Sequence, residues 1–139
     1  MDPSDSYVLE RQVGFVMRRA VQRHIDIFSA LIPEMTPTQF AALAKLCELG
    51  QASQNELGRL TSMDVATIKG VVDRLRQRGL VEAGADQADR RRVLLRPTGA
   101  GKDLFDGLVA QARMATAETL EPLTEDERTV FLRLLEKLV

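Results

Sequence analysis

The chain has 139 residues, of which 45% are hydrophobic and 28% are charged, which predicts one folded domain and excludes a disordered chain. Its net charge of −1 argues against indiscriminate binding to nucleic acid. No apolar run is long enough to cross a membrane, residues 1–6 are acidic and polar, and Cys47 is the one cysteine, so we expect a cytoplasmic protein with no signal peptide, anchor or internal disulfide.

Residues 7–31 are predicted to form one long helix that ends at Pro33. Its apolar positions recur at steps of three and four residues: Val13, Met17, Ala20, His24, Ile27 and Leu31. Thr36 is suited to cap the next helix, with Pro37 in its first position and Gly50 as its stop. We expect the buried face of this second helix to consist of Phe40, Leu43, Ala44 and Cys47.

Two shorter helices follow. Ser53 and Glu56 have the spacing of a capping box, which predicts the start of a third helix. Asp64 is suited to cap a fourth helix, which we expect to run to Arg78 and to stop at Gly79. The predicted inward face of the fourth helix is Ile68, Val71, Val72 and Leu75.

A small β-hairpin comes next. Residues 80–83 and 92–96 are predicted strands, and residues 84–91 are the loop between them. Two short helices followed by a hairpin with an arginine-rich tip are typical of a winged helix-turn-helix, in which one helix enters the major groove and the basic loop reaches the minor groove. We therefore predict a mainly α fold with a small β-hairpin, in which residues 36–97 form the DNA-binding lobe.

The helices at the two ends of the chain are predicted to pair two copies of it. Thr98 is suited to cap a long fifth helix, and Thr124 and Glu127 form a second capping box before the last one. The apolar stripe of the last helix is Val130, Phe131, Leu134, Leu135 and Leu138. The segments 7–31 and 98–139 are more apolar than a compact reading head requires, so we expect a homodimer whose two recognition helices lie about one DNA turn apart.

Charge is distributed unevenly along the chain. Residues 64–96 contain eight Lys or Arg and five Asp or Glu, a balance of +3, whereas the remainder carries −4. A basic patch on an acidic body is the expected footprint of a protein that binds DNA through one face.

The chain resembles the multiple-antibiotic-resistance regulator (MarR) family of bacterial transcription factors over nearly its whole length. The motifs that carry the resemblance are Val72-Asp73-Arg74-Leu75, Arg78-Gly79-Leu80-Val81 and Asp89-Arg90-Arg91-Arg92 followed by Thr98, Gly99 and Gly101. Pro97 departs from the family, which usually has leucine there. The resemblance implies a homodimeric repressor or activator on a palindromic operator, which a small aromatic or anionic effector releases by binding between the dimerisation helices and the DNA-binding lobe. The segments TPTQFAALAKL and SQNELGRLTSMDVATIKGVVDRL are most similar to regulators of aromatic or nicotinate catabolism.

If the fourth helix enters a groove, its outward residues are the candidates for DNA contact: Ala66, Thr67, Lys69, Gly70, Arg74 and Arg76. Thr67 and Lys69 are suited to base edges, and the arginines to phosphate; a solvated helix surface is the alternative. Gly70 weakens the helix, which is tolerable if it allows close packing or close approach to a sugar-phosphate backbone. Residues at the start of the third helix are suited to donate to phosphates, although capping alone would explain the first of them: Ser53, Gln54 and Asn55.

The wing arginines are Arg90, Arg91 and Arg92. A narrow minor groove concentrates negative potential and attracts an inserted arginine. The resemblance implies that one arginine of this motif braces the wing by pairing with Asp73 and that another enters the groove. We assign Arg90 to the brace and Arg91 to the groove, and a solvent-exposed charge cluster is the alternative.

His24 is the only histidine and lies on the apolar stripe of the first helix. Its simplest role is a core or interface histidine held by one hydrogen bond. The functional alternative is a donor to an effector carboxylate, helped by Arg18 or Arg19. The apolar wall of such a pocket would be Met17, Phe28 and Phe40, although packing explains each of them as well. Packing also explains Cys47, because the peroxide-sensing cysteine of some relatives lies near the start of the first helix.

Two other classes of function were weighed. A winged-helix module that binds protein and has lost its affinity for DNA would not need a basic tip, so the arginine wing argues against it. An enzyme is disfavoured because one histidine, one cysteine, no glycine-rich phosphate loop and no metal-spaced ligand cluster assemble no catalytic site. We therefore expect no catalytic residue, metal or cofactor. The expected partners are double-stranded operator DNA, a second copy of the chain and a small aromatic or anionic effector.

Overall fold

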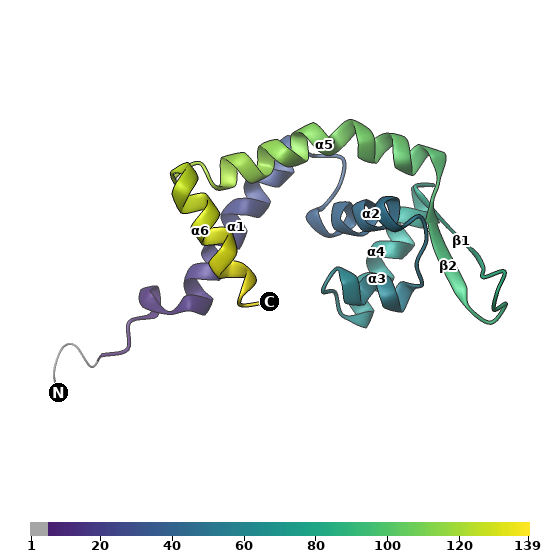
Figure 1. Cartoon of the computed structure of the whole chain (residues 1–139), viewed down its shortest axis with the longest axis horizontal. Helices are drawn as coiled ribbons and strands as arrows, with labels where there is room; N and C mark the ends of the chain where they lie inside the picture. Colours follow the sequence, from purple (N-terminus) through teal and green to yellow (C-terminus); the bar gives the residue numbers. More distant parts are fainter. Residues whose placement is uncertain (1–5) are drawn as a thin grey trace. The chain divides into compact units, whose positions relative to one another are not determined.

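The computed structural model describes residues 6–139; residues 1–5, most of the segment that bears on the signal-peptide expectation, lie outside the described part. The described residues are mainly helical with one antiparallel hairpin, so the predicted fold class is confirmed (Figure 1). The elements are η2 (Leu9–Arg11), α1 (Val13–Leu31), α2 (Pro37–Leu49), α3 (Gln54–Leu60), α4 (Val65–Gln77), β1 (Val81–Ala85), β2 (Val93–Pro97), α5 (Gly99–Thr119) and α6 (Glu125–Glu136). The chain folds as two compact units. One unit is Ile32–Gln111, and the other combines Met1–Leu31 with Ala112–Val139.

The core of the Ile32–Gln111 unit lies among α2, α3 and α4. Its most deeply buried large side chains are Ile32, Leu43, Leu46, Leu57, Ile68, Val72 and Leu75. The predicted inward face of α4 is confirmed, because all four of its residues are buried. The predicted face of α2 is correct only at Leu43, since Ala42 and Leu46 are buried whereas Ala44 and Cys47 are half-buried. The reason is that α2 is covered on more than one side: half-buried Phe40 packs on Phe105 of α5, with ring centroids 5.6 Å apart.

Most helices begin at the predicted capping residues. A backbone N–H three residues ahead donates to the side chain of each of Thr36, Asp64, Thr98 and Thr124. The capping box predicted for α3 is only half formed. Ser53 Oγ accepts from the Glu56 N–H at 3.2 Å, but the Glu56 carboxylate is engaged by Arg92 instead of returning to the cap.

The strands of the hairpin are displaced from their predicted bounds. β1 excludes Leu80 and runs to Ala85, two residues beyond the predicted end, and β2 runs from Val93 to Pro97, one residue later than predicted. The register runs from Val81 opposite Pro97 to Ala85 opposite Val93, and beyond it the Asp86 N–H donates to the Arg92 carbonyl at 2.8 Å. A further bridge joins β2 to the segment before α3, where the Ala52 and Leu95 backbones exchange hydrogen bonds of 3.1 and 2.8 Å. The wing is therefore hydrogen-bonded to the start of the helix-turn-helix.

The second unit contains η2, α1, the end of α5, and α6. The predicted single helix from residue 7 is wrong at its start, because Gln12 has an extended backbone (φ −84°, ψ 133°) that separates η2 from α1. The Gln12 side chain also donates to the Val8 carbonyl at 3.0 Å, which folds the chain back before the helix. Within the described residues we find no helix long and apolar enough to span a membrane.

Candidate nucleic-acid interface

A tight turn fixes α4 against α3. A Cβ on Gly58 would lie 3.1 Å from Ile68 Cγ2 and 3.2 Å from the Met63 carbonyl oxygen, so the glycine permits the close approach of the two helices. Ser62 in the turn has φ 55°, and the Met63 N–H donates to the Gly58 carbonyl at 2.8 Å. Our sequence analysis did not single out these residues. The signal that could have found them is a glycine inside a short helix, followed by a polar turn before a capping aspartate.

The outward face of α4 is exposed. The predicted DNA-contacting residues on this helix are all exposed: Ala66, Thr67, Lys69, Gly70, Arg74 and Arg76. A Cβ on Gly70 would meet no atom within 4 Å, so close packing inside the chain does not explain this glycine. Of the two roles that the sequence suggested for Gly70, close packing and close approach to a sugar-phosphate backbone, the second remains.

The first turn of α4 is held by its cap. The Thr67 N–H donates to Asp64 Oδ1 at 2.7 Å. This hydrogen bond is the main reason that the pKa of the Asp64 carboxyl lies below its ordinary value. At neutral pH the capping group is therefore a carboxylate, and it stabilises the end of α4 that carries Thr67.

The start of α3 offers polar groups beside the wing. Ser53 and Gln54 are half-exposed and Asn55 is exposed, while Ser53 also serves as the cap. Arg96 of β2 donates from Nε to Gln51 Oε1 at 3.0 Å, which adds a side-chain link to the Ala52–Leu95 bridge. The segment that leads into α3 is thus tied to β2.

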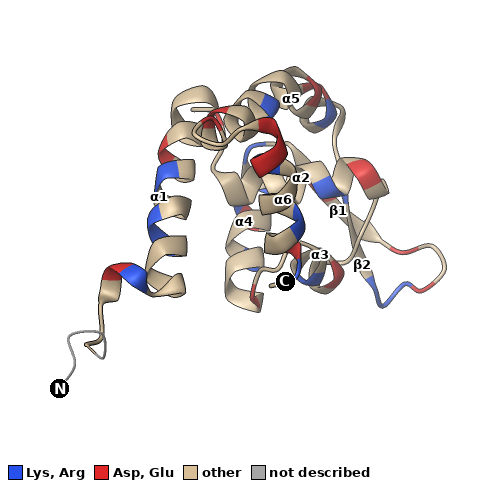
Figure 2. Cartoon of the chain, turned by 60° about the vertical axis from the view of Figure 1, so that its left-hand side comes forward, with Lys and Arg blue, Asp and Glu red and all other residues tan. Residues whose placement is uncertain are grey.

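The wing loop uses its acidic residues to order its backbone. The Asp86 and Asp89 carboxylates accept from the N–H groups of Ala88 and Arg91 at 2.9 and 3.1 Å. The three arginine side chains of the loop are exposed. Figure 2 shows their positions as a blue stretch of the loop before β2. The loop therefore has an ordered backbone and presents three positively charged side chains to solvent.

The predicted brace between Asp73 and Arg90 is not formed among the described residues. Asp73 instead pairs with Lys69 at 2.8 Å. The two residues are neighbours one turn apart on α4, so the helix itself brings their side chains together. The wing arginine held by an ion pair is Arg92, whose Nη2 lies 3.2 Å from Glu56 Oε2 of α3. The structure thus assigns the bracing contact to Arg92 and Glu56.

A hollow lies beside α4 and contains two arginines and one aspartate. It encloses about 590 Å³ and is lined by Gln39, Gly70, Asp73, Arg74, Gln77 and Arg78. Gln39 is the buried polar side chain of this unit, and its Oε1 accepts from Arg78 Nη1 at 3.3 Å. This bond ties the end of α4 to the start of α2. The sequence predicted DNA contacts for Gly70 and Arg74 of this hollow, but no signal in it pointed to Gln39.

The predicted effector residues are divided between the two units. Met17, Arg18, Arg19, His24 and Phe28 lie on α1, whereas Phe40 lies on α2. On α1 the half-buried His24 ring lies 6.2 Å from the buried Phe28 ring, and its Nδ1 is 2.8 Å from Thr119 Oγ1. The Arg19 guanidinium lies over the Phe15 ring, 5.6 Å from its centroid, so a cation–π contact already engages it.

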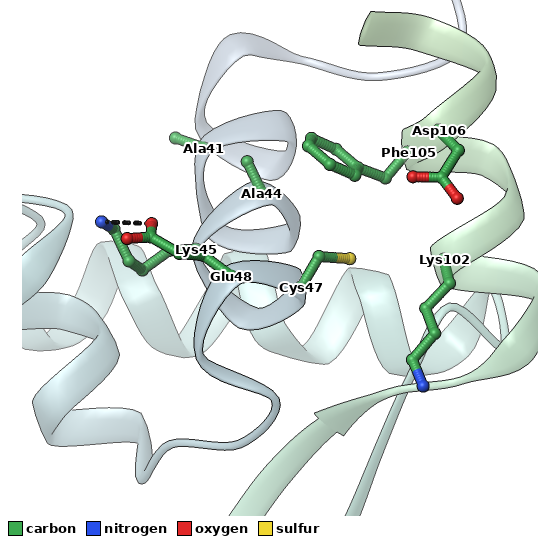
Figure 3. A pocket seen from close by; sticks show the side chains of 8 residues that line it. All are labelled: Ala41, Ala44, Lys45, Cys47, Glu48, Lys102, Phe105 and Asp106. Carbon is green, nitrogen blue, oxygen red and sulfur yellow. Dashed lines mark hydrogen bonds and ion pairs between the residues drawn. The ribbon is translucent and has the colours of Figure 1, made fainter.

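A pocket of about 600 Å³ lies between α2 and α5 in the Ile32–Gln111 unit (Figure 3). Its apolar wall includes Ala41, Ala44 and Phe105, and Lys102 and Asp106 lie along α5. Its charged residues are balanced, because Lys45 and Lys102 face the carboxylates Glu48 and Asp106, and Lys45 is paired with Glu48 at 2.7 Å. The sequence predicted packing roles for Ala44 and Cys47 and no site here.

Cys47 also lines this pocket. Burial raises the pKa of its thiol, the Asp106 carboxylate raises it further, and Lys102 acts in the opposite direction. A thiol in this setting is a poor nucleophile at neutral pH, which agrees with the packing role that the sequence predicted. In residues 6–139 we find no group of three His, Cys, Asp or Glu side chains that could hold a metal ion.

An apolar face lies on the other unit. Val13, Val16 and Met17 of α1 and four residues of α6 and the chain end line a groove of about 270 Å³: Phe131, Leu134, Leu135 and Leu138. All seven are exposed, and Val13 and Leu138 retain 66% and 67% of their accessible surface. Exposure of so many large apolar side chains at one site marks an interaction surface.

Comparisons with known proteins agree with this arrangement. Residues 34–92 match the family model described as MarR family. The chain is 39% identical over 135 residues to the HTH-type transcriptional repressor NicR of Pseudomonas putida, covering 96% of this chain and 85% of that protein. A crystal structure of a probable transcriptional regulator from Pseudomonas aeruginosa has a TM-score of 0.93 and 44% identity, and the match covers 95% of this chain and 100% of that one.

A further solved structure concerns regulation of the DNA binding of Bordetella bronchiseptica BpsR by 6-hydroxynicotinic acid. BpsR is 38% identical to this chain, with a TM-score of 0.91 and coverage of 96% of each chain. These relatives are named as transcriptional regulators, which confirms the prediction of a regulator rather than an enzyme.

Proposed function

Because the chain belongs to the MarR family of transcriptional regulators, we propose that it is a dimeric repressor that binds a palindromic operator and leaves it when a small aromatic acid binds. The observation that carries the proposal is the combination of an exposed face on α4 with an ordered, arginine-bearing wing. A repressor of bacterial genes works in the cytoplasm, the compartment that the single cysteine predicts.

In the complex, α4 lies in the major groove. Thr67 and Lys69 contact base edges, and Arg74 and Arg76 contact phosphates. Gly70 allows the helix backbone to come close to the DNA. Polar groups at the start of α3 donate to phosphates: Ser53, Gln54 and Asn55.

The wing enters the adjacent minor groove. Arg92 is occupied by Glu56, whereas the side chains of Arg90 and Arg91 have no ion pair or hydrogen bond within the described residues. Of these two, Arg91 inserts, since the Asp89 carboxylate fixes its backbone N–H at 3.1 Å. Arg90 contacts the phosphate backbone. The Arg92–Glu56 pair sets the angle of the loop, so we place Arg92 at the edge of the interface.

The apolar face of α1 and α6 is the dimer interface. A second copy of the chain would cover the groove that Val13, Met17 and Leu138 line, and it would remove large apolar side chains from water. A two-fold axis would then place the two α4 helices at the spacing of an operator with inverted half-sites.

The effector is an aromatic acid of the 6-hydroxynicotinate kind. BpsR, whose DNA binding is regulated by 6-hydroxynicotinic acid, supports this class, and the chain offers Arg18 and His24 on α1 for the polar groups of the effector. Met17 and Phe28 of α1 supply apolar contacts. Bound effector would favour a spacing of the two recognition helices that does not fit the operator, with a coupling free energy of about 1–3 kcal/mol.

The test is a fluorescence-anisotropy titration of a labelled duplex from the promoter region next to the gene. We expect operator binding that weakens steeply with salt, with a slope set by the number of phosphate contacts, and release when 6-hydroxynicotinic acid is added. A scrambled duplex controls for sequence-independent binding. Equal affinity for the two duplexes, or no binding at low salt, would favour the protein-interaction alternative and refute the proposal.

A further inference from the structure

The histidine of α1 is held by a chain of two hydrogen bonds. His24 Nδ1 lies 2.8 Å from Thr119 Oγ1, and that hydroxyl donates to the Ala115 carbonyl at 2.7 Å. A hydroxyl group has one proton to donate. Because Thr119 uses it on Ala115, the only role left to the hydroxyl toward His24 is that of acceptor. The imidazole proton therefore stays on Nδ1, and Nε2 is the ring nitrogen available to other groups.

The position of Thr119 is itself fixed. The Arg23 guanidinium donates to the Thr119 carbonyl at 2.6 Å and to the Glu118 carbonyl at 2.9 Å. Carbonyls in the last turn of a helix have no partner within it, so a neighbouring arginine is a suitable donor. Arg23 thus fastens the end of α5 to α1, one residue before the histidine.

We infer that Thr119 is a positioning residue that makes His24 select effectors carrying a hydroxyl or ring N–H group. In a neutral imidazole with its proton on Nδ1, Nε2 is an acceptor. It can accept from a ring hydroxyl or from the N–H of a hydroxypyridine in its lactam form. A carboxylate has no proton to offer, so the neutral ring does not serve as the carboxylate donor that the sequence suggested. The inference rests on the proposed function for the presence of an effector, but the tautomer itself does not.

The single histidine makes the tautomer directly measurable. Nitrogen-15 NMR of the labelled protein at alkaline pH, where imidazole is neutral, gives one pair of ring signals. We expect a protonated Nδ1 and an unprotonated Nε2 in the wild type and in Thr119→Ser, which keeps the hydroxyl. Thr119→Val should lose this preference. Thr116→Val, on the exposed side of the same helix, is the matched control and should match the wild type. A wild-type ring protonated on Nε2 would overturn the inference, whether or not the variants fold.

Effector selection is the second readout. The ratio of the concentrations of nicotinic acid and 6-hydroxynicotinic acid that release half of the operator measures the preference for the hydroxylated acid. We expect Thr119→Val to lower this ratio about five- to tenfold, the worth of one good hydrogen bond, with operator affinity in the absence of acid unchanged. An unchanged ratio in a variant whose tautomer has changed would overturn the selective role. If neither acid releases the wild-type complex, the proposed function fails, and the NMR result still shows separately whether Thr119 sets the tautomer.

Discussion

Arg91→Ala separates the reading role of the wing from its structural role. The Arg91 side chain makes no ion pair or hydrogen bond within residues 6–139, and its backbone N–H, which Asp89 holds at 3.1 Å, survives the substitution. The variant should therefore fold as the wild type does, with a free energy of unfolding within about 0.5 kcal/mol of it. Any larger change in operator affinity must then come from the contact with DNA.

The expected loss is that of one charge-assisted hydrogen bond, about 1–3 kcal/mol, which raises the operator Kd roughly five- to 150-fold. Losing one phosphate-proximal cation should also lower the slope of log K against log salt by up to about 0.9. Fluorescence anisotropy over a salt series measures both quantities, and analytical ultracentrifugation checks that the assembly state is unchanged.

Lys45→Ala is the control for net charge alone. Lys45 carries the same charge on α2 and pairs with Glu48 at 2.7 Å, away from the predicted interface. It should leave the operator Kd within about twofold of the wild type, since exposed pairs contribute about 0–1 kcal/mol. Equal losses in the two variants, or an unchanged Kd for Arg91→Ala, would refute the minor-groove assignment.

Three further predictions, one of them with a control substitution, test other parts of the structure. Gly70→Ala should raise the free energy of unfolding by about 0.5–1 kcal/mol, because its methyl group meets no atom within 4 Å. The same methyl group should weaken operator binding. A variant that is both more stable and tighter in operator binding would place α4 outside the groove. Gly101→Ala should lower the free energy of unfolding by about 1–3 kcal/mol and the Tm by several degrees, because a Cβ at this position overlaps the Leu80 carbonyl. Gly107→Ala is the control: its methyl group meets no atom within 4 Å, so this substitution should raise the Tm. The lowered pKa of Asp64 means that its capping contribution is complete at neutral pH and disappears as acid protonates the carboxylate. Melting curves of the wild type and Asp64→Asn should therefore differ at pH 7 and converge in acid, and a gap independent of pH would show that the carboxylate charge is not what matters.

The sequence predicted the features that depend on residues close together in the chain, such as helix caps and the buried face of a helix. Thr36, Asp64 and Thr124 cap their helices as expected, because a cap is a contact between residues three positions apart. The inward face of α4 was also predictable, since a regular period places apolar residues on one side. The order of elements then identified the winged helix-turn-helix.

The contacts that the sequence did not predict join residues far apart in the chain. Glu56 fits a capping box, but its carboxylate is engaged by an arginine 36 positions away. Asp73 was expected to reach the wing and instead pairs along its own helix, because Lys69 is one turn away. The link between His24 and Thr119 spans 95 positions, and no local pattern announces it. Candidate site residues could therefore be named from the sequence, whereas their partners required the fold.

The backbone bridge between Ala52 and Leu95 bears on how such a regulator can acquire a new target. Main-chain atoms make the bridge, so it does not depend on which side chains the loop beyond it carries. The loop 86–92 can accordingly change in length or charge while the backbone bridge at Leu95 stays in place. Grafting a loop from another regulator between Ala85 and Val93 should then alter the preferred flanking bases and leave the half-site read by the helix as it was.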